Sequence, residues 1–380
     1  MTSGPVRAAE PPMTARDVVR QDLEDICGRL KAELAALQGK RLFISGGAGF
    51  LGYYLIQAAL HWNATRPGPP VHVIACDNYI RGVPTWLTAL AADPALTLVQ
   101  HDITTPLPGG LGDFDFVIHA ASIASPTYYR KHPIETMDAN VNGLRLLLER
   151  CRAQHRDGHP VAGFLFFSTS EIYGDPTADQ IPTPETYRGN VSCTGPRACY
   201  DESKRFGETL CVTFAREFGL PVTIARPFNN YGPGLKITDR RVIADFARDL
   251  LAGRDLVLLS DGSPTRTFCY IADAVVGYYK ILVRGRAGEP YNIGNDAPEI
   301  SMRSLALVLA GLARTQLGYA GRVIHQDSHD TQYLSDNPQR RCPVIAKARA
   351  ELEFDPQWPL EDGLARTLVW YRDNAQAQEA

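Results

Sequence analysis

Residues 41–55, "RLFISGGAGFLGYYL", run from a short apolar segment through clustered glycines into a segment that favours a helix. Gly47, Gly49 and Gly52 satisfy the spacing GxGxxG, and Gly46 with the last two satisfies the looser GxxGxxG. Glycines at this spacing allow a tight turn, let the backbone approach a pyrophosphate and let the helix pack close to the strand. The stretch is compatible with a plain turn, but its position between a predicted strand and a helix favours a dinucleotide site.

An acidic residue closes the next apolar run. Asp77 ends "PVHVIACD" (70–77), where a carboxylate can hydrogen-bond the ribose diol of a dinucleotide. The same carboxylate repels a 2′-phosphate, so the sequence favours NAD over NADP, although Arg81 nearby weakens that preference. Asp102 ends "LTLVQHD" (96–102) and is consistent both with an adenine contact and with an ordinary loop cap.

Six nearly continuous apolar runs alternate with helical segments in the first part of the chain. They occupy residues 41–46, 70–77, 96–102, 114–121, 162–170 and 221–228. Runs of this kind are typical of parallel strands buried on both faces, so we predict an α/β fold with a Rossmann-type doubly wound parallel sheet. We expect an N-terminal tail and amphipathic helix over 1–39 and an NAD-binding domain over 40–228. A smaller substrate-binding lobe is expected mainly over 229–380, interleaved with that domain.

The N-terminal segment has its own pattern. Residues 1–14 are rich in Pro, Ala and Gly and predict a mobile tail. In 15–37, the residues Val19, Leu23, Ile26, Leu30 and Leu34 recur at helical spacing. A helix packed on the domain surface is the favoured interpretation, and a partner-binding helix is the alternative.

Composition narrows the class of function. The 380 residues are 44% hydrophobic, and 39 basic and 42 acidic residues give a net charge of −3, which offers no broad basic field for nucleic acid. The eight cysteines form no CxxC pair, so no metal site is expected and reduced thiols suit the cytoplasm. Neither a signal-peptide core nor an apolar stretch of membrane-spanning length is present, so we expect a cytoplasmic protein that does not enter a membrane.

A YxxxK spacing supplies candidate catalytic residues. Tyr200 and Lys204, in "YDESK", fall on one face of a predicted helix. An ammonium beside a phenol stabilises the phenolate, so we expect Lys204 to lower the pKa of Tyr200 toward neutral pH. Thr169, in "FFSTSEIYG", ends a predicted strand at the sheet edge where sites of this fold open, and it can hold a substrate oxygen against the tyrosine.

Several segments now occur in a recognisable order. They are "GGAGFLG" (46–52), "DN" (77–78), "HAAS" (119–122), "STSEIYG" (168–174), "YDESK" (200–204) and "RPFNNYGPG" (226–234). From about residue 40 to residue 375 the chain resembles the extended short-chain dehydrogenase/reductase family of NAD-dependent epimerases and dehydratases, which act on nucleotide sugars. The resemblance implies a homodimer and a tightly held NAD that oxidises a sugar C4 hydroxyl and often returns the hydride.

The resemblance also implies the residues of the site. The cofactor is expected to contact Gly46, Gly49, Phe50, Leu51, Gly52, Asp77, Asn78, Asp102, Ile103, Ala120, Ala121, Ser122, Tyr200 and Lys204. The nucleotide sugar is expected to contact Tyr128, Asn229, Arg241, Arg266, Tyr291 and Arg341. Catalysis is assigned to Thr169, Ser170, Glu171, Tyr200, Lys204 and Arg266. For several of these polar residues, a structural role in a loop is the alternative.

The pair after Thr169 bears on the reaction. A 4-keto sugar can be reduced from its other face, lose water across C5 and C6, or lose a C6 carboxylate as CO2. Dehydratases of the family usually carry Asp-Glu here and 4-epimerases carry small or neutral residues, whereas this chain has Ser170 and Glu171. "STSEIYGDP" (168–176), "GPRACYDESK" (195–204), "SPTRTFCYIAD" (263–273), "YNIGN" (291–295) and "DNPQRRCPVIAKAR" (336–349) resemble the UDP-glucuronate decarboxylases of the family.

We therefore expect NAD-dependent decarboxylation of UDP-glucuronate to UDP-xylose through a UDP-4-keto intermediate. A 4,6-dehydratase or 4-epimerase is the alternative, and a non-catalytic NAD sensor is a remote one. Val344, "DRR" at 239–241 and the segment 328–336 depart from the usual decarboxylase pattern. These departures leave open whether the substrate nucleotide carries uridine or thymidine. Release of some 4-keto-pentose before the reduction step is also left open.

Overall fold

Seven parallel strands form the central sheet of the computed structural model, which describes residues 12–326 and 338–378. The strands are β1 (Arg41–Ser45), β2 (His72–Asp77), β3 (Leu96–Gln100), β4 (Phe116–His119), β5 (Gly163–Phe167), β6 (Val222–Pro227) and β11 (Pro290–Ile293). Their order is β11-β6-β5-β4-β1-β2-β3, and every neighbouring pair is parallel. The predicted doubly wound parallel sheet is confirmed, and its order reverses between β1 and β4, where sites of this fold open.

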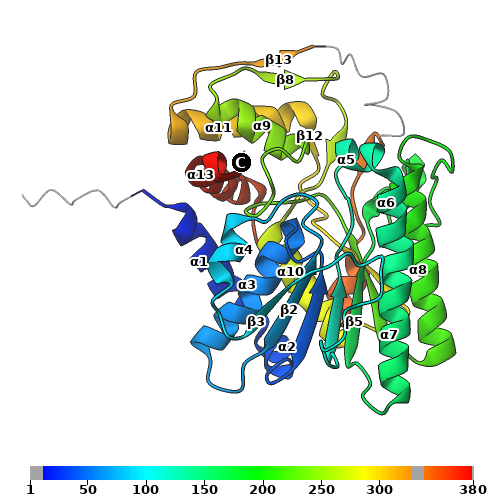
Figure 1. Cartoon of the computed structure of the whole chain (residues 1–380). Helices are drawn as coiled ribbons and strands as arrows, with labels where there is room; N and C mark the ends of the chain where they lie inside the picture. Colours follow the sequence, from blue (N-terminus) through cyan, green and yellow to red (C-terminus); the bar gives the residue numbers. More distant parts are fainter. Residues whose placement is uncertain (1–11, 327–337, 379–380) are drawn as a thin grey trace, which may run out of the picture.

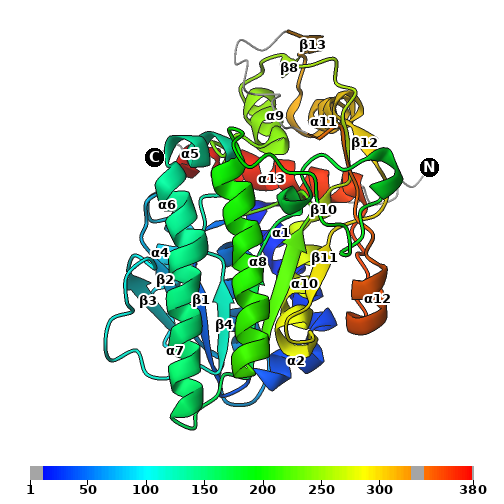
Figure 2. The same cartoon turned by 90° about the vertical axis from the view of Figure 1, so that its right-hand side faces the viewer.

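Helices cover both faces of the sheet (Figures 1 and 2). One face packs against α3 (Phe50–Thr65) and α10 (Ile271–Arg284), and the other against α7 (Leu144–Arg156) and α8 (Ala198–Phe218). Within β1, Leu42 and Ile44 belong to the first core, whereas Phe43 belongs to the second. Strands buried on both faces explain why these segments read as continuous apolar runs.

Short elements connect the sheet to the helices around the site. α2 (Lys31–Ala36) and α4 (Thr85–Leu90) lie in the first half of the chain, and α5 (Pro126–Lys131) and α6 (Pro133–Asp138) precede a π-helical turn, η1 (Ala139–Gly143). Two 3₁₀ turns, η2 (Ser170–Tyr173) and η3 (Ala178–Gln180), follow β5. η2 lies directly at the carboxyl end of β5, so residues 169–171 leave the sheet at its open edge.

A smaller lobe lies beyond the carboxyl edge of the sheet (Figure 1). It contains α9 (Val242–Leu251), α11 (Met302–Leu317), α13 (Leu360–Gln378) and three small sheets, whereas α12 (Ala346–Leu352) packs beside α10 and β11 of the larger domain (Figure 2). These sheets pair β7 (Asn230–Tyr231) with β10 (Cys269–Tyr270), β8 (Leu256–Leu258) with β13 (Val323–His325), and β9 (Thr265–Arg266) with β12 (Ile300–Ser301) and β14 (Arg340–Arg341). Because β11 and α10 pack with the central sheet although they follow residue 228, the two lobes are interwoven along the chain.

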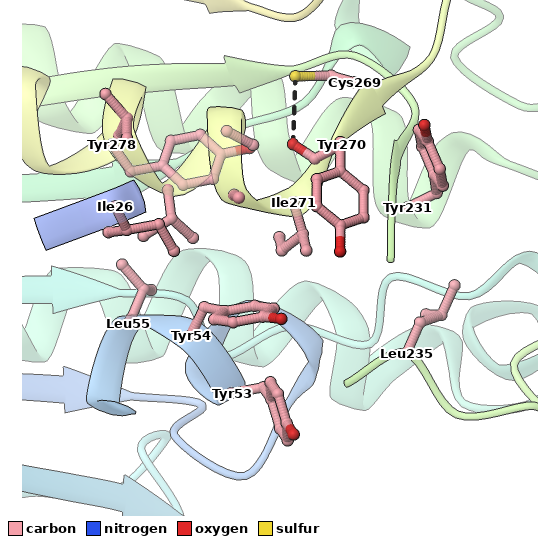
Figure 3. Close-up of a cluster of buried hydrophobic side chains, with 14 of the residues drawn as sticks. Ile26, Tyr53, Tyr54, Leu55, Tyr231, Leu235, Cys269, Tyr270, Ile271 and Tyr278 are labelled. Atoms are coloured by element: carbon pink, nitrogen blue, oxygen red, sulfur yellow. Dashed lines mark hydrogen bonds between the residues drawn. The ribbon is translucent and has the colours of Figure 1, made fainter. Parts of the chain in front are cut away.

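The N-terminal helix is part of the core. α1 (Ala15–Arg29) begins with a capping box between Thr14 and Asp17, and its side chain Ile26 packs among Tyr54, Leu55 and Ile271 (Figure 3). The predicted helix over 15–37 is thus present, divided at Leu30 into α1 and α2. Residues 1–11 of the predicted tail lie outside the described residues.

Buried polar contacts also hold α1 in place. The Asp22 carboxylate is fully buried and accepts hydrogen bonds from Tyr270 Oη at 2.7 Å and Arg366 Nη2 at 2.6 Å, as well as from Tyr54 Oη. This arrangement fits a helix packed on the domain. In the described part of the chain, none of the helices combines the length and apolar character that a bilayer crossing requires.

Candidate active site

The glycine turn after β1 is built so tightly that side chains are excluded. Gly46 has φ of 75°, and a Cβ on it would lie 2.6 Å from the backbone of Ala120. A Cβ on Gly52 would lie 2.1 Å from the Gly47 carbonyl oxygen. Gly52 therefore allows α3 to approach the turn, while Gly49 stands at the N-cap of that helix without a side-chain cap. The positive end of the helix dipole thus faces the turn, as the binding of a pyrophosphate requires.

Asp77 braces this turn from the end of β2. Its carboxylate accepts hydrogen bonds from the backbone N–H of Ala48 at 3.0 Å and of Tyr79 at 2.8 Å. Burial raises the pKa of Asp77 above its ordinary value, although these two N–H groups and Lys236 oppose the shift. Asp102 is exposed, lines the same cavity and caps its own loop through Thr104, while its contact with adenine stays a prediction.

A cavity of about 1070 Å³ opens where the sheet edge meets the smaller lobe. It is lined by nearly every residue predicted for the site: Gly46, Gly49, Phe50, Leu51, Asp77, Asn78, Asp102, Ile103, Ala120, Ala121, Ser122, Thr169, Ser170, Glu171, Tyr200, Lys204, Asn229, Arg241, Arg266 and Arg341. Ser122 Oγ is buried and has no hydrogen-bond partner among the described residues, which leaves a hydroxyl for a ligand. The glycine cradle and this hydroxyl fit a dinucleotide.

Three predicted residues lie outside that lining. Gly52 acts behind the turn, through helix packing. Tyr128 is covered by the Arg81 guanidinium, 4.0 Å from its ring centroid, and Tyr291 donates from its hydroxyl to Glu351 Oε2 at 2.8 Å. Substrate contacts for Tyr128 and Tyr291 remain predictions.

Thr169, Tyr200 and Lys204 converge on one side of the cavity. Tyr200 and Lys204 lie one turn apart on α8, and Thr169, two residues after the end of β5, caps η2 by accepting from Glu171 N at 3.2 Å. Lys204 Nζ donates to the Phe167 carbonyl at 2.7 Å and lies 5.9 Å from the Tyr200 ring centroid. This arrangement brings a phenol, an ammonium and a hydroxyl to the same end of the parallel sheet.

The charge state of Tyr200 differs from the expectation. Burial raises the pKa of Tyr200 to about 12, although a hydrogen bond with Thr169 opposes the shift, and Lys204 is not among its largest causes. Burial also lowers the pKa of Lys204 to about 7, so its positive charge is itself weakened at neutral pH. Burial thus outweighs any effect of Lys204 here, and the expected lowering of the Tyr200 pKa toward neutral pH is not found.

Glu171 is clamped by two arginines. Its Oε1 and Oε2 accept from Arg341 Nη1 at 2.5 Å and Nη2 at 2.6 Å, and Oε2 also pairs with Arg197 Nη2. Burial opposes ionisation, but the charges of Arg197 and Arg341 hold the pKa of Glu171 at about 2. Glu171 is therefore a carboxylate, not a proton donor, in this arrangement.

Arg266 joins the same cluster from a neighbouring strand. Arg266 on β9 and Arg341 on β14 are register partners, and the Arg266 guanidinium donates to the carbonyls of Thr265, Pro338 and Gln339 at 2.6–3.1 Å. Burial and the adjacent Arg341 lower the pKa of Arg266 to about 9. A third guanidinium is thus fixed by the backbone beside the Glu171 clamp.

The two remaining predicted contacts, Asn229 and Arg241, come from the segment between β6 and α9. Asn229 has φ of 43° and donates to the Thr267 carbonyl at 2.8 Å, while Arg241 pairs with Asp239 at 3.0 Å. Asp239 also pairs with Arg81 at 3.2 Å, which links the loop after β2 to the smaller lobe. Among the described residues, no group of three or more His, Cys, Asp or Glu side chains could hold a metal ion.

Arg197, Asp201 and Tyr129 lie around the catalytic residues and were not predicted. Arg197 binds Glu171, and Asp201 faces Arg197 Nε at 3.6 Å. The Tyr129 ring stacks on Tyr200 with centroids 5.1 Å apart, and its buried hydroxyl has no partner among the described residues. The segment "GPRACYDE" carried a signal for the first two, because neither the fold nor a dinucleotide site requires Arg197 or Asp201.

Comparisons with known proteins agree with this geometry. A family model described as the NAD dependent epimerase/dehydratase family matches residues 42–294. UDP-glucuronic acid decarboxylase 3 of Arabidopsis thaliana is 36% identical over 324 residues, covering 85% of this chain and 86% of that protein. The structure of dTDP-glucose 4,6-dehydratase from Streptomyces venezuelae, with NAD bound, has a TM-score of 0.75 at 29% identity, covering 89% of this chain and 99% of that one.

A third similar protein carries a uronate ligand. The structure of UDP-glucuronic acid 4-epimerase from Bacillus cereus, in complex with UDP-glucuronic acid and NAD, has a TM-score of 0.69 at 26% identity. That match covers 87% of this chain and 98% of the other. The similarities thus extend over the central sheet and the smaller lobe together.

Proposed function

Since the chain belongs to the NAD-dependent epimerase/dehydratase family, we propose that it is a decarboxylase that converts UDP-glucuronate to UDP-xylose through a UDP-4-keto intermediate. NAD is the cofactor of the family, and the glycine turn, Asp77 and Ser122 are the residues that would hold it. Bound NAD supplies a hydride acceptor and, when oxidised, a positive charge in the cavity. The chain's own residues supply orientation and proton transfer.

The observation that carries the proposal is the Ser170-Glu171 pair beside Thr169, Tyr200 and Lys204. A 4,6-dehydratase needs an acid that protonates the departing C6 hydroxyl, but Ser170 is not an acid and the pKa of Glu171 is held at about 2. Loss of a C6 carboxylate as CO2 needs no such proton, because the electrons of the broken C5–C6 bond stay on the sugar and delocalise into the C4 carbonyl. The ionised Glu171 therefore favours decarboxylation over dehydration.

Each catalytic side chain has a defined task in this proposal. Tyr200 takes the proton of the C4 hydroxyl, and Thr169 orients the C4 oxygen. Lys204 holds the cofactor ribose and stabilises the negative charge on deprotonated Tyr200. After CO2 leaves, a proton returns to C5 and the C4 ketone is reduced. Glu171, with Arg266 beside it, orders the carboxylate or the water that supplies that proton.

A 4-epimerase is the second candidate, because the solved UDP-glucuronic acid 4-epimerase has the same fold and a uronate ligand. The test is to incubate the purified protein with UDP-glucuronate and, separately, with UDP-glucose and dTDP-glucose, while CO2 and product mass are followed. We expect the uronate alone to lose the mass of CO2. Loss of water from a hexose, or a uronate product of unchanged mass, would refute decarboxylation in favour of dehydration or epimerisation.

We also propose that the protein is a cytoplasmic homodimer. Ile134 and Met137 on α6 and Phe206 on α8 are 60%, 36% and 51% exposed, and these two helices lie on the same face of the molecule, toward the viewer in Figure 2. A second copy packed on this face would cover these apolar side chains. All eight cysteines are free, which suits a reducing compartment. Phe206→Glu should convert a dimer to a monomer in light scattering, and an unchanged mass would contradict this interface.

A further inference from the structure

Arg197 occupies a position that the proposed mechanism has not yet used. It is the N-cap residue of α8, three residues before Tyr200, and it lines the cavity together with Tyr200 and Glu171. Three residues along a helix correspond to about 4.5 Å of rise, so Arg197 lies within one turn of the tyrosine. Because both side chains line the same cavity, a substrate whose C4 oxygen meets Tyr200 can bring its neighbouring atoms to the Arg197 guanidinium.

Arg197 makes fewer bonds than Arg341 and Arg266, the two other arginines beside Glu171. Arg341 binds both Glu171 oxygens, and Arg266 donates to three backbone carbonyls. Arg197 pairs with one Glu171 oxygen through Nη2, and its buried Nε has no hydrogen-bond partner among the described residues. Its nearest other acid, Asp201, lies 3.6 Å from that Nε, beyond hydrogen-bonding distance.

The arginines and acids in this cluster do not balance in charge. Arg197, Arg266 and Arg341 face the buried acids Glu171 and Asp201, while Asp175, which also attracts Arg266, is exposed to solvent. Burial together with the Glu171 charge raises the pKa of Asp201 to about 7, so Asp201 is only partly ionised at neutral pH. The cluster thus has an excess of positive charge in a part of the cavity where these side chains are little exposed. Buried charge of one sign calls for a counter-ion, which points to an anionic group on the ligand.

A carboxylate has the right shape for that position. Glu171 already shows that a carboxylate fits between Arg197 and Arg341, and it keeps both of its oxygens on Arg341 if Arg197 turns to a ligand. In a uronate the C6 carboxylate is attached to C5, directly next to C4. The group that Arg197 can reach beside Tyr200 is therefore the one that distinguishes a uronate from a hexose.

We propose that Arg197 is a specificity-determining residue that exchanges the Glu171 carboxylate for the C6 carboxylate of the nucleotide sugar. This inference rests on the proposed function for the identity of the sugar. The exchange makes Glu171 an internal occupant of the carboxylate position, which keeps the guanidinium paired when no uronate is present. A neutral C6 hydroxymethyl group cannot displace Glu171 from Arg197, so hexose nucleotides gain nothing at this position.

The test compares two ligands that differ only at C6. Arg197→Met and Arg197→Lys are made beside a control, Arg216→Met, in the last turn of the same helix and outside the cavity lining. For each NAD-loaded enzyme, kcat and KM are measured with UDP-glucuronate, and Ki is measured for UDP-glucose. We expect Arg197→Met to raise the KM of the uronate about tenfold to a hundredfold while the Ki of UDP-glucose stays within about twofold.

The lysine variant and the control separate recognition from folding. Arg197→Lys keeps the positive charge but loses the paired N–H donors with which a guanidinium binds both oxygens of a carboxylate. Its KM for the uronate should therefore fall between those of wild type and Arg197→Met. Arg216→Met should match the wild type for both ligands. Equal weakening of both ligands, or no change in the uronate KM, would overturn the proposal. If Arg197→Met does not fold, the uronate-to-hexose ratio of Arg197→Lys decides.

Binding measurements distinguish this inference from the proposed function. If the wild type releases no CO2 from UDP-glucuronate, the proposed function has failed. The role of Arg197 is then still decided by titrating both nucleotides, with UDP as a sugar-free reference, into the NAD-loaded Tyr200→Phe enzyme with and without Arg197→Met. A selective loss of uronate affinity supports the exchange, and a parallel loss of all three affinities refutes it.

Discussion

Replacing Glu171 by Gln removes the charge that holds two buried arginines. The pKa of Glu171 is held at about 2 against an ordinary value of 4.5, and each pKa unit corresponds to about 1.4 kcal/mol, so the clamp is worth roughly 3 kcal/mol. Ionisation of Asp201, whose pKa is raised to about 7 partly by Glu171, returns some of that pairing to Arg197 in the variant. We therefore expect Glu171→Gln to lower the free energy of unfolding by about 2–3 kcal/mol at pH 7.

Urea denaturation at several pH values tests this magnitude. A carboxyl whose folded pKa is depressed stabilises the fold above its unfolded pKa and loses that contribution as pH falls through the folded pKa. The wild type should therefore lose its advantage over Glu171→Gln between about pH 4.5 and pH 2. The matched control is Glu202→Gln on α8, whose half-exposed pair with Arg205 at 3.6 Å should contribute less than about 1 kcal/mol.

The clamp itself is tested by a double-mutant cycle. If Glu171 acts through Arg197, the effects of Glu171→Gln and Arg197→Met on stability should couple rather than add. A loss at pH 7 as small as that of Glu202→Gln, or a difference from wild type that persists at pH 2, would show that the clamp does not hold this charge.

Other parts of the structure give further predictions. Gly52→Ala should push α3 off the glycine turn and abolish NAD binding in titration. The control Gly28→Ala in α1, with no atom within 4 Å of the new Cβ, should keep NAD binding and stabilise the fold by about 1 kcal/mol. Equal NAD affinities of the two variants would contradict the close approach of α3 to the turn. Lys204→Met should reduce turnover at least a hundredfold. Because the folded pKa of Lys204 is lowered to about 7, the wild type should lose stability as pH falls from about 10.5 to 7, and the variant should not. If the urea midpoints of both proteins depend on pH in the same way, Lys204 is not a buried ammonium with a depressed pKa. Asp22→Asn should cost about 3–5 kcal/mol in urea unfolding, and a loss below about 1 kcal/mol would mean that α1 is not anchored by Arg366.

The local parts of the site were predictable because their signals are local. The glycines at 46–52 follow one strand and open one helix, so their spacing alone specifies the turn that the structure shows. Tyr200 and Lys204 share a helix face because four residues make about one turn. The continuous apolar runs predicted the parallel sheet, because its strands are buried on both faces.

Tertiary packing decided what surrounds those residues. Tyr128 and Tyr129 are neighbours on α5, but their rings point to different partners. Tyr129 stacks on Tyr200, whereas Tyr128 lies under the Arg81 guanidinium. The raised pKa of Tyr200 also arises from burial, which a YxxxK spacing does not report. A pattern in sequence names the neighbours along the chain, but not the solvent or the charges that the fold brings to them.

The sequence by itself thus determined the sheet, the dinucleotide turn and the identity of the Ser170-Glu171 pair. Only the tertiary structure decided the state of Glu171, because Arg341 stands 170 positions away along the chain and Arg197 reaches it from the start of α8. These three residues come together because Glu171 follows the end of β5, Arg197 stands at the start of α8 and Arg341 ends β14. Coulomb attraction between groups that distant in sequence depends on how strands and helices are ordered in space.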